Sequence, residues 1–120
     1  MRLARTYVDY LRDILSHAQK AEHFAGLDFE AFRSNEEKLF AVLRALEVIG
    51  EAARQLPPAV RRRYADVPWR NVIGMRNTII HGYVGVDVEV IWKTVHESLP
   101  PLRAVVERML ADLESEGWQE

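Results

Sequence analysis

Four polar side chains fall close together in one apolar stretch of the sequence. Arg76, Asn77 and His81 are set among isoleucines and valines at helical spacing, and Tyr83 follows after a single glycine. A helix advances about 100° per residue, so Asn77 and His81, four residues apart, share one face. Arg76 lies about 100° to one side of Asn77, and its long side chain can bridge the gap to His81. The spacing therefore predicts that one arc of a helix presents a cation, an amide and an imidazole.

These groups suit cleavage of an RNA phosphodiester bond by the neighbouring 2′-hydroxyl. Histidine titrates near neutral pH, so His81 is the candidate base. Arginine stays charged, so Arg76 can neutralise the charge that grows on the phosphoryl oxygens, and Asn77 can orient a hydroxyl or the imidazole. No spacing of His, Asp and Glu resembles a metal site. We therefore expect a metal-independent ribonuclease without a cofactor, which leaves a 2′,3′-cyclic phosphate and a 5′-hydroxyl.

Spacing alone favours a simpler interpretation, with a buried arginine on a carboxylate, a capping asparagine and a surface histidine. The order of the motif and its flanks favour catalysis. Arg76, His81 and Tyr83 resemble the R-x4-H-x-Y motif of the HepT-like (DUF86) toxins of the HEPN superfamily, and Asn77 fills the second position of its RN form. The flanks PWR..IGMRN and GVD, and LEVIGEAAR at Leu46 to Arg54, are similar to the same family. The resemblance extends over nearly the whole chain.

The resemblance implies a function and two partners. It implies a homodimer in which two motifs face one cleft and the second copy supplies a second histidine. It implies the toxin of a type VII toxin–antitoxin pair, an endoribonuclease with tRNA among its candidate substrates. It also implies an MntA-type nucleotidyltransferase antitoxin that neutralises the toxin by AMPylation of Tyr83. Val84 departs from the pattern, since relatives often carry an aromatic residue there. The alternative is a non-catalytic helical dimer that binds nucleotide or regulates a nucleotidyltransferase.

Composition limits the class of protein. A chain of 120 residues, 48% hydrophobic and 28% charged, is typical of a single soluble domain over 1–120. The absence of cysteine excludes disulfides and thiolate metal sites. No apolar run reaches the roughly 18 residues of a membrane helix, and no signal peptide begins the chain, so we expect a cytoplasmic protein. The net charge of −2 argues against a broad nucleic-acid-binding surface but allows a small basic cleft.

Hydrophobic periodicity predicts an all-α, up-and-down bundle of four to five helices. The first helix spans about Leu3 to Phe24. The second begins at a capping box formed by Ser34 and Glu37, and two prolines stop it at about Leu56. A short helix follows from Pro58.

The motif lies on the next predicted helix, which Asp66 caps and Gly82 ends, with Pro68 in its first turn. Asp87 caps a long final helix, which kinks at two prolines but does not turn back. Its tail over residues 115–120 is acidic, and we expect it to fray. The apolar stripe of this helix consists of Ile91, Val95, Leu99, Leu102, Val106, Met109 and Leu113.

Two further features bear on the site. Glu47 and Glu51 lie four residues apart on the second helix, where like charges repel unless cations intervene. Either they form a solvated face with nearby arginines, or one of them, for which we choose Glu51, reaches Arg76 and fixes its guanidinium. Gly50 would let another helix approach closely here. The run Arg61–Arg63 is typical of a solvated face and can also lead a phosphate backbone toward the cleft, although we expect at least one of its members only to be solvated.

Overall fold

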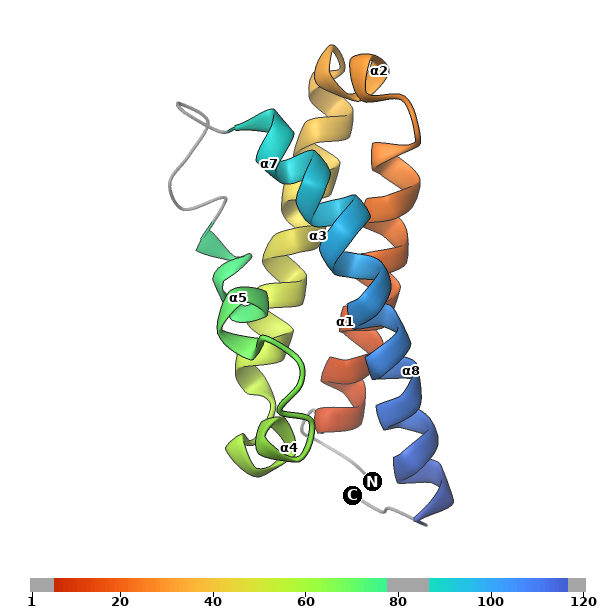
Figure 1. The fold of residues 1–120 in the computed structure, drawn as a ribbon, viewed down its shortest axis with the longest axis vertical. Coiled ribbons are helices and arrows are strands. Elements are labelled where there is room, and N and C mark those ends of the chain that lie inside the picture. The colour runs from red at the N-terminus through yellow and green to blue at the C-terminus, as the bar shows by residue number, and fades with distance from the viewer. Residues whose placement is uncertain (1–5, 78–86, 117–120) are drawn as a thin grey trace.

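Three long helical segments run side by side along the long axis of a molecule that measures 46 × 28 × 25 Å. The computed structural model describes residues 6–77 and 87–116. In chain order the elements are α1 (Tyr7–Ala25), α2 (Phe29–Arg33), α3 (Glu36–Gln55), α4 (Pro58–Arg63), α5 (Trp69–Gly74), α7 (Val88–Lys93), the π-helix η1 (Thr94–Ser98) and α8 (Leu99–Ser115). Helix α1 runs antiparallel to α3 and α8, and α5 packs on the outer side of α3 (Figure 1). Within these described ranges there is no strand, so the all-α prediction is confirmed.

The predicted apolar stripes form one core. On α1 the stripe residues Leu11, Ile14, Ala18 and Ala21 are fully buried. The stripes of α3 and of the final helix close over them, as the periodicity predicts. The largest fully buried side chains of this core are those of Phe32, Leu11, Ile14, Leu46, Ile49, Leu56, Leu99, Met109, Val42, Val95 and Val106.

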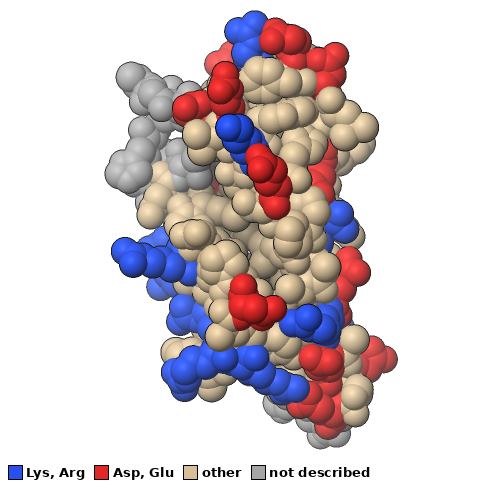
Figure 2. Space-filling view, viewed as in Figure 1, with Lys and Arg blue, Asp and Glu red and all other residues tan. Residues whose placement is uncertain are grey.

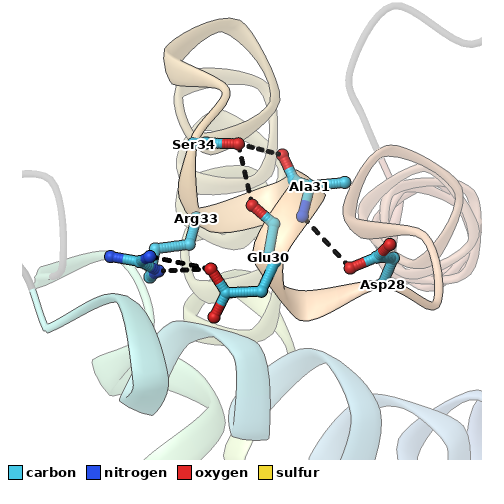
Figure 3. Close-up of polar contacts among 5 residues, drawn as sticks. All are labelled: Asp28, Glu30, Ala31, Arg33 and Ser34. Atoms are coloured by element: carbon cyan, nitrogen blue, oxygen red, sulfur yellow. Dashed lines mark hydrogen bonds and ion pairs between the residues drawn. The ribbon is translucent and has the colours of Figure 1, made fainter.

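The predicted start of α3 is wrong by one residue. Asn35, not Ser34, is the N-cap, and its side-chain oxygen accepts a hydrogen bond from the Lys38 amide at 3.1 Å. Ser34 belongs to the end of α2, where its hydroxyl donates to the carbonyl oxygen of Glu30 at 2.8 Å (Figure 3). Because the preceding helix occupies the serine hydroxyl, the capping box with Glu37 does not form.

The connection between α4 and α5 is fixed by an indole. The Nε1 of Trp69 donates to the carbonyl oxygens of Arg61 at 3.1 Å and Tyr64 at 3.0 Å, and the Trp69 ring is buried. Both carbonyls also accept backbone amides, from Tyr64 at 3.2 Å and Val67 at 3.1 Å, so the indole is a second donor to each. These bonds join the two short helices into one corner.

Asp66 does not cap α5, contrary to the sequence prediction. Pro68 occupies the N-cap position, and no side chain hydrogen-bonds the first amides of the helix. The Asp66 carboxylate instead lies 3.9 Å from the guanidinium of Arg108 on α8. A neighbouring contact from Tyr64, whose hydroxyl donates to Asp112 at 2.5 Å, also ties the α4–α5 corner to α8.

The final helix begins as predicted. Asp87 is the N-cap of α7, and its Oδ1 accepts from the amides of Glu89 at 3.0 Å and Val90 at 3.3 Å. The chain then continues without turning back through η1 into α8. Pro100 lacks an amide hydrogen and its ring crowds the carbonyl four residues earlier, so the wider π turn just before it accommodates the predicted kink.

Trp92 packs against three aromatic rings at the edge of the core. Its centroid lies 5.5 Å from those of Phe29 and Phe32 and 4.1 Å from that of His96. Trp92 is partly buried and packs against the core without belonging to its buried set. In the part of the chain that the structure describes, no helix is both long enough and apolar enough to cross a membrane.

Candidate functional site

The motif helix is shorter than the sequence predicts. Helix α5 ends at Gly74, and Met75 and Arg76 form a turn. The Met75 amide donates to the carbonyl of Val72 at 3.1 Å, and the Arg76 amide donates to that of Ile73 at 3.3 Å. Both bonds reach back three residues, which winds the chain more tightly than an α-helix. Arg76 is therefore presented from a turn at the end of α5, not from the interior of a helix.

The prediction of a single helix through the motif is wrong, because this turn interrupts it; the predicted end at Gly82 lies outside the described residues. Asn77 follows the turn and is exposed. His81 and Tyr83, with the remainder of residues 78–86, lie outside the described residues. Their position relative to Arg76 stays a prediction from the sequence.

Gly50 of α3 allows the close contact on which this turn rests. A Cβ built on Gly50 would lie 2.5 Å from the amide nitrogen of Arg76 and 2.8 Å from the carbonyl oxygen of Ile73. It would also lie 2.9 Å from the Cβ of Arg76. Real Cβ atoms do not approach backbone so closely, so only glycine fits at this position. The predicted close approach at Gly50 is confirmed, and the element that approaches is the one that carries Arg76.

Glu51, the next residue on α3, holds the Arg76 side chain. The Nη1 of Arg76 donates to Oε1 of Glu51 at 2.8 Å. The other oxygen of Glu51 lies 3.4 Å from Arg54, while Glu47 pairs with Arg44 instead. Of the two carboxylates that the sequence offered, Glu51 is therefore the one that reaches Arg76. The hydrogen bond from Arg76 is the main reason that the pKa of the Glu51 carboxyl lies below its usual value.

The Arg76 guanidinium keeps donors for a ligand. Its side chain is 32% exposed, and its Nε is buried without a hydrogen-bond partner. A guanidinium has five N–H donors, and only one of them is bound to Glu51 in the described structure. Because its backbone and one nitrogen are fixed, the free donors are held in one orientation, as binding of a phosphate oxygen requires.

A polar groove lies beside the Glu51–Arg76 pair, between α1 and α3. A groove of about 520 Å³ is bordered by Glu51 at one end and by Glu47, one turn away on the same helix. Tyr10 and Asp13 line its other wall from α1. Arg44 also lines the groove, and it pairs with Glu47 there.

A second recess lies between α5 and the final helix. Two adjoining cavities, of about 380 and 340 Å³, share Asn71, Met75 and Ser98 as lining residues. Sequence reasoning gave no role to Asn71, although an exposed polar residue inside the apolar motif segment is a signal for one. Met75 connects this recess directly to the turn that presents Arg76.

No metal site accompanies these groups in residues 6–77 and 87–116, where no three His, Asp or Glu side chains gather closely enough to hold an ion. The site that can be described therefore consists of Arg76, its partner Glu51 and the exposed Asn77. It can bind and neutralise an oxyanion. A base must come from outside this set, and His81 is the residue that the motif offers.

Comparison with known proteins covers most of the chain. The family model described as Ribonuclease HepT-like matches residues 11–109. A protein named "Probable ribonuclease HepT" from Thermococcus cleftensis is 42% identical over 108 residues, which is 89% of this chain and 98% of that protein. "Putative RNase MJ0125" from Methanocaldococcus jannaschii is 38% identical over 106 residues, 88% of this chain and 91% of that protein. "Putative RNase TTE0752" from Caldanaerobacter subterraneus is 37% identical over 102 residues, 84% of this chain and 91% of that protein. No solved structure matches the chain.

The matched residues 11–109 include all of the elements that hold the site. They contain Gly50 and Glu51 on α3, the turn at Arg76, and the final helix as far as Met109. These relatives bear names of ribonucleases, which supports the prediction of an enzyme that acts on RNA. On the extent of this match, and on identities above one third over nearly full length, the chain belongs to the HepT-like ribonuclease family.

Proposed function

We propose that this chain is a metal-independent endoribonuclease in which Arg76 binds the scissile phosphate and His81 moves the proton. The observation that carries the proposal is the anchoring of Arg76, whose backbone rests on Gly50 and whose guanidinium is held by Glu51 at 2.8 Å. Family membership supports RNA as the substrate class.

The proposed reaction is an attack of the RNA 2′-hydroxyl on the adjacent phosphorus. The bond from the 2′-oxygen to phosphorus forms, and the proton of the hydroxyl passes to His81. The bond from phosphorus to the 5′-oxygen breaks, and that oxygen takes a proton from an acid. Arg76 donates hydrogen bonds to the non-bridging oxygens as their charge grows. The products are a 2′,3′-cyclic phosphate and a 5′-hydroxyl.

A homodimer would supply the acid. One imidazole does not readily serve as base and acid in the same turnover, so the second copy's His81 is the proposed proton donor. Two copies of Arg76 would also double the positive charge at the phosphate. This arrangement concentrates positive charge at the site in a chain whose net charge is −2.

The proposed biological role is that of the toxin in a type VII toxin–antitoxin pair. The partner would be an MntA-type nucleotidyltransferase that transfers AMP from ATP to the hydroxyl of Tyr83, with pyrophosphate as the leaving group. Tyr83 lies two residues beyond His81 in the sequence. A phosphate attached there would occupy the donors of Arg76 and repel RNA.

Expression without the partner tests the catalytic proposal. The parent chain is expected to arrest growth and to produce RNA fragments that end in 2′,3′-cyclic phosphate. Arg76→Ala and His81→Ala are expected to abolish both effects. Arg103→Ala is the matched control, because Arg103 is also 32% exposed and also pairs with a glutamate on another helix, Glu22 at 2.5 Å.

The control separates loss of the site from loss of an ion pair. Arg103→Ala is expected to retain growth arrest and the same RNA ends. Retained cleavage in His81→Ala would contradict the role of His81. A parent chain that neither arrests growth nor cleaves RNA would favour the non-catalytic alternative, a helical dimer that binds nucleotide.

Intact mass measures the proposed neutralisation. Co-expression with the neighbouring nucleotidyltransferase is expected to add one or more AMP units to the chain and to suppress RNA cleavage. Tyr83→Phe is expected to remove the added mass and to restore cleavage in the presence of the partner. An addition that persists in Tyr83→Phe would place the modification elsewhere.

A further inference from the structure

Positive charge is concentrated in the segment that leads to the site. Residues 56–76 contain five arginines and one aspartate, a formal charge of +4, whereas the whole chain has −2. The remaining residues therefore carry −6. Figure 2 shows Lys and Arg side chains gathered over the region where Figure 1 places α4 and α5. The charge thus lies on one surface next to the turn that carries Arg76.

Ion pairs remove some of these arginines from consideration. Arg63 is bound by both oxygens of Glu116 and lies over the ring of Tyr64. The aspartate of the segment, Asp66, points to Arg108 of α8, 3.9 Å away. Arg63 is therefore engaged in an ion pair within the fold and is not counted among the arginines available to a ligand.

Three arginines of the segment have no carboxylate partner in the described structure. Arg62 and Arg70 are exposed, and Arg61 is partly buried with an Nε that has no hydrogen-bond partner. Seven lysines and arginines of the described residues lack an ion pair, and three of the seven lie between positions 61 and 70. The three are Arg61, Arg62 and Arg70, which we call the α4–α5 basic surface.

Hydrogen bonds connect the two helices beneath this surface. Arg61 lies on α4 and Arg70 on α5, and the indole of Trp69 joins the two helices through the carbonyls of Arg61 and Tyr64. Arg70 lies on α5, the helix that ends at Gly74, directly before the turn that presents Arg76. The three cations therefore lie on the two helices that lead to that turn.

We propose that the α4–α5 basic surface binds the phosphate backbone of the RNA on one side of the scissile bond and delivers it to Arg76. The inference rests on the proposed ribonuclease function. Arginine pairs with phosphate oxygens through charge-assisted hydrogen bonds. Such contacts bind RNA irrespective of sequence and position it for the catalytic groups.

A polyanion fits this surface better than a protein partner does. The core of a protein–protein interface is apolar and depleted in charge. The large hydrophobic side chains that are exposed in the described residues belong to other parts of the fold and are absent from α4 and α5. They are Phe24, Leu27, Phe40 and Val90.

Binding of an RNA that cannot be cleaved tests the surface alone. The probe is a short single-stranded RNA with every 2′-hydroxyl methylated, which keeps the phosphates but lacks the attacking group. Arg61→Gln/Arg62→Gln/Arg70→Gln is expected to weaken binding tenfold or more at low salt. Since each single-strand phosphate contact contributes about −0.7 to the slope of log K against log salt, loss of three contacts makes that slope less steep by about 2.

A matched variant controls for net charge. Arg12→Gln/Lys20→Gln/Lys93→Gln removes three exposed cations from α1 and α7, none of which has an ion pair in the described structure. It changes the net charge equally and is expected to alter affinity less than twofold. Equal loss of affinity in both triple variants would overturn the proposal. Arg62→Gln/Arg70→Gln, in which both residues are exposed, repeats the measurement if replacement of Arg61 reduces folding.

Cleavage of unmodified RNA separates this proposal from the catalytic one. The triple variant of the α4–α5 basic surface is expected to raise KM more than it lowers kcat. An unchanged KM, with cleavage intact, would contradict RNA binding by this surface and would leave the ribonuclease proposal unaffected. If this triple variant binds the methylated RNA normally but no longer binds the nucleotidyltransferase, the surface serves that partner and the proposal is overturned. If the triple variant binds the methylated RNA less tightly, but the parent chain cleaves no RNA, the result would support the RNA-binding surface and contradict the ribonuclease proposal.

Discussion

Gly50 and Arg76 are in backbone contact, and the hydrogen bond between the Arg76 amide and the Ile73 carbonyl lies over the α-carbon of Gly50. A methyl group at Gly50 would meet both atoms of that bond, at 2.5 and 2.8 Å. The next residue, Glu51, holds the guanidinium of the same arginine. Two adjacent positions of α3 therefore fix the backbone and the side chain of Arg76 separately.

Gly50→Ala is expected to destabilise the protein by about 1–3 kcal/mol, because the contacting atoms are backbone and cannot move aside independently. This loss outweighs the helix propensity of alanine, which favours it over glycine by about 1 kcal/mol. It should also lower RNA cleavage by displacing Arg76. Urea unfolding and initial rates of cleavage measure the two effects.

Gly74→Ala is the control for this substitution. Gly74 also lies on a helix, but nothing is within 4 Å of a Cβ built there, and its φ is not positive. The free energy of unfolding is expected to stay the same or to rise by up to about 1 kcal/mol. Equal destabilisation by both substitutions would show that the contact with Arg76 is not the cause.

Glu51→Gln is expected to lower kcat for RNA cleavage about 10- to 100-fold, because a loosely held guanidinium loses its orientation. The stability of the protein should change by less than about 1 kcal/mol, since both side chains of the pair are partly exposed. Glu47→Gln, one turn earlier, touches Arg44 and not Arg76 and should leave kcat unchanged. Equal loss in the two variants would argue against a positioning role for Glu51.

The stability contributed by the Glu51–Arg76 pair is expected to depend on pH, and it should fall in acid. Arg76 holds the pKa of Glu51 below its usual value, so the stabilisation is present above the unfolded pKa of about 4.3. It is lost as the pH falls through the folded pKa. The difference in unfolding free energy between the parent and Glu51→Gln should therefore disappear in acid. A difference that persists well below pH 4 would contradict this.

Tyr64 is expected to ionise about two pH units above an ordinary tyrosine. Burial, and then its hydrogen bond to Asp112, raise the pKa of Tyr64 to about 12. The folded state holds this proton after the unfolded state has lost it, so stability falls as the pH rises from about 10 to 12. Tyr64→Phe should flatten that fall, and at neutral pH it should cost about 1–3 kcal/mol because Asp112 loses a donor. Ultraviolet titration and urea unfolding measure both.

Asn35→Ala is expected to destabilise the protein by about 1 kcal/mol through loss of the α3 cap. Ser34→Ala is expected to cost less, because the Ser34 hydroxyl binds only a carbonyl at the exposed end of α2. Thermal unfolding of the two variants ranks them. The opposite ranking would restore Ser34 as the cap.

The long elements could be predicted from the sequence because periodic burial determines them. The stripe on α1 and the stripe from Ile91 to Met109 are buried as the periodicity predicts. Gly50 could also be interpreted from the sequence, since glycine inside an apolar helix suggests a close approach. The sequence does not specify the angle at which α5 packs on α3. That angle decides which element approaches Gly50, and whether Glu51 or Glu47 reaches Arg76.

The errors lie where neighbouring residues compete for the same role. Ser34 and Asn35 are both capping residues, and the end of α2 decides which is free. Asp66 resembles a cap, but Arg108 on a helix remote in sequence binds it. The turn after Gly74 arises because α5 meets α3 at Gly50, a tertiary contact that overrides the apolar helical pattern of the motif. Each error is thus a case in which packing outweighed a local preference.

The unequal division of charge between residues 56–76 and the remainder of the chain gives the molecule a permanent electric dipole. If the proposed RNA-binding surface is correct, this dipole would turn an approaching RNA before contact, and the acidic remainder would repel it from unproductive directions. A chain with an excess of carboxylates can thereby capture a polyanion rapidly in one orientation. Added salt would slow that capture without changing the bond-breaking step, because ions in solution shorten the reach of the field to about 10 Å at 0.1 M.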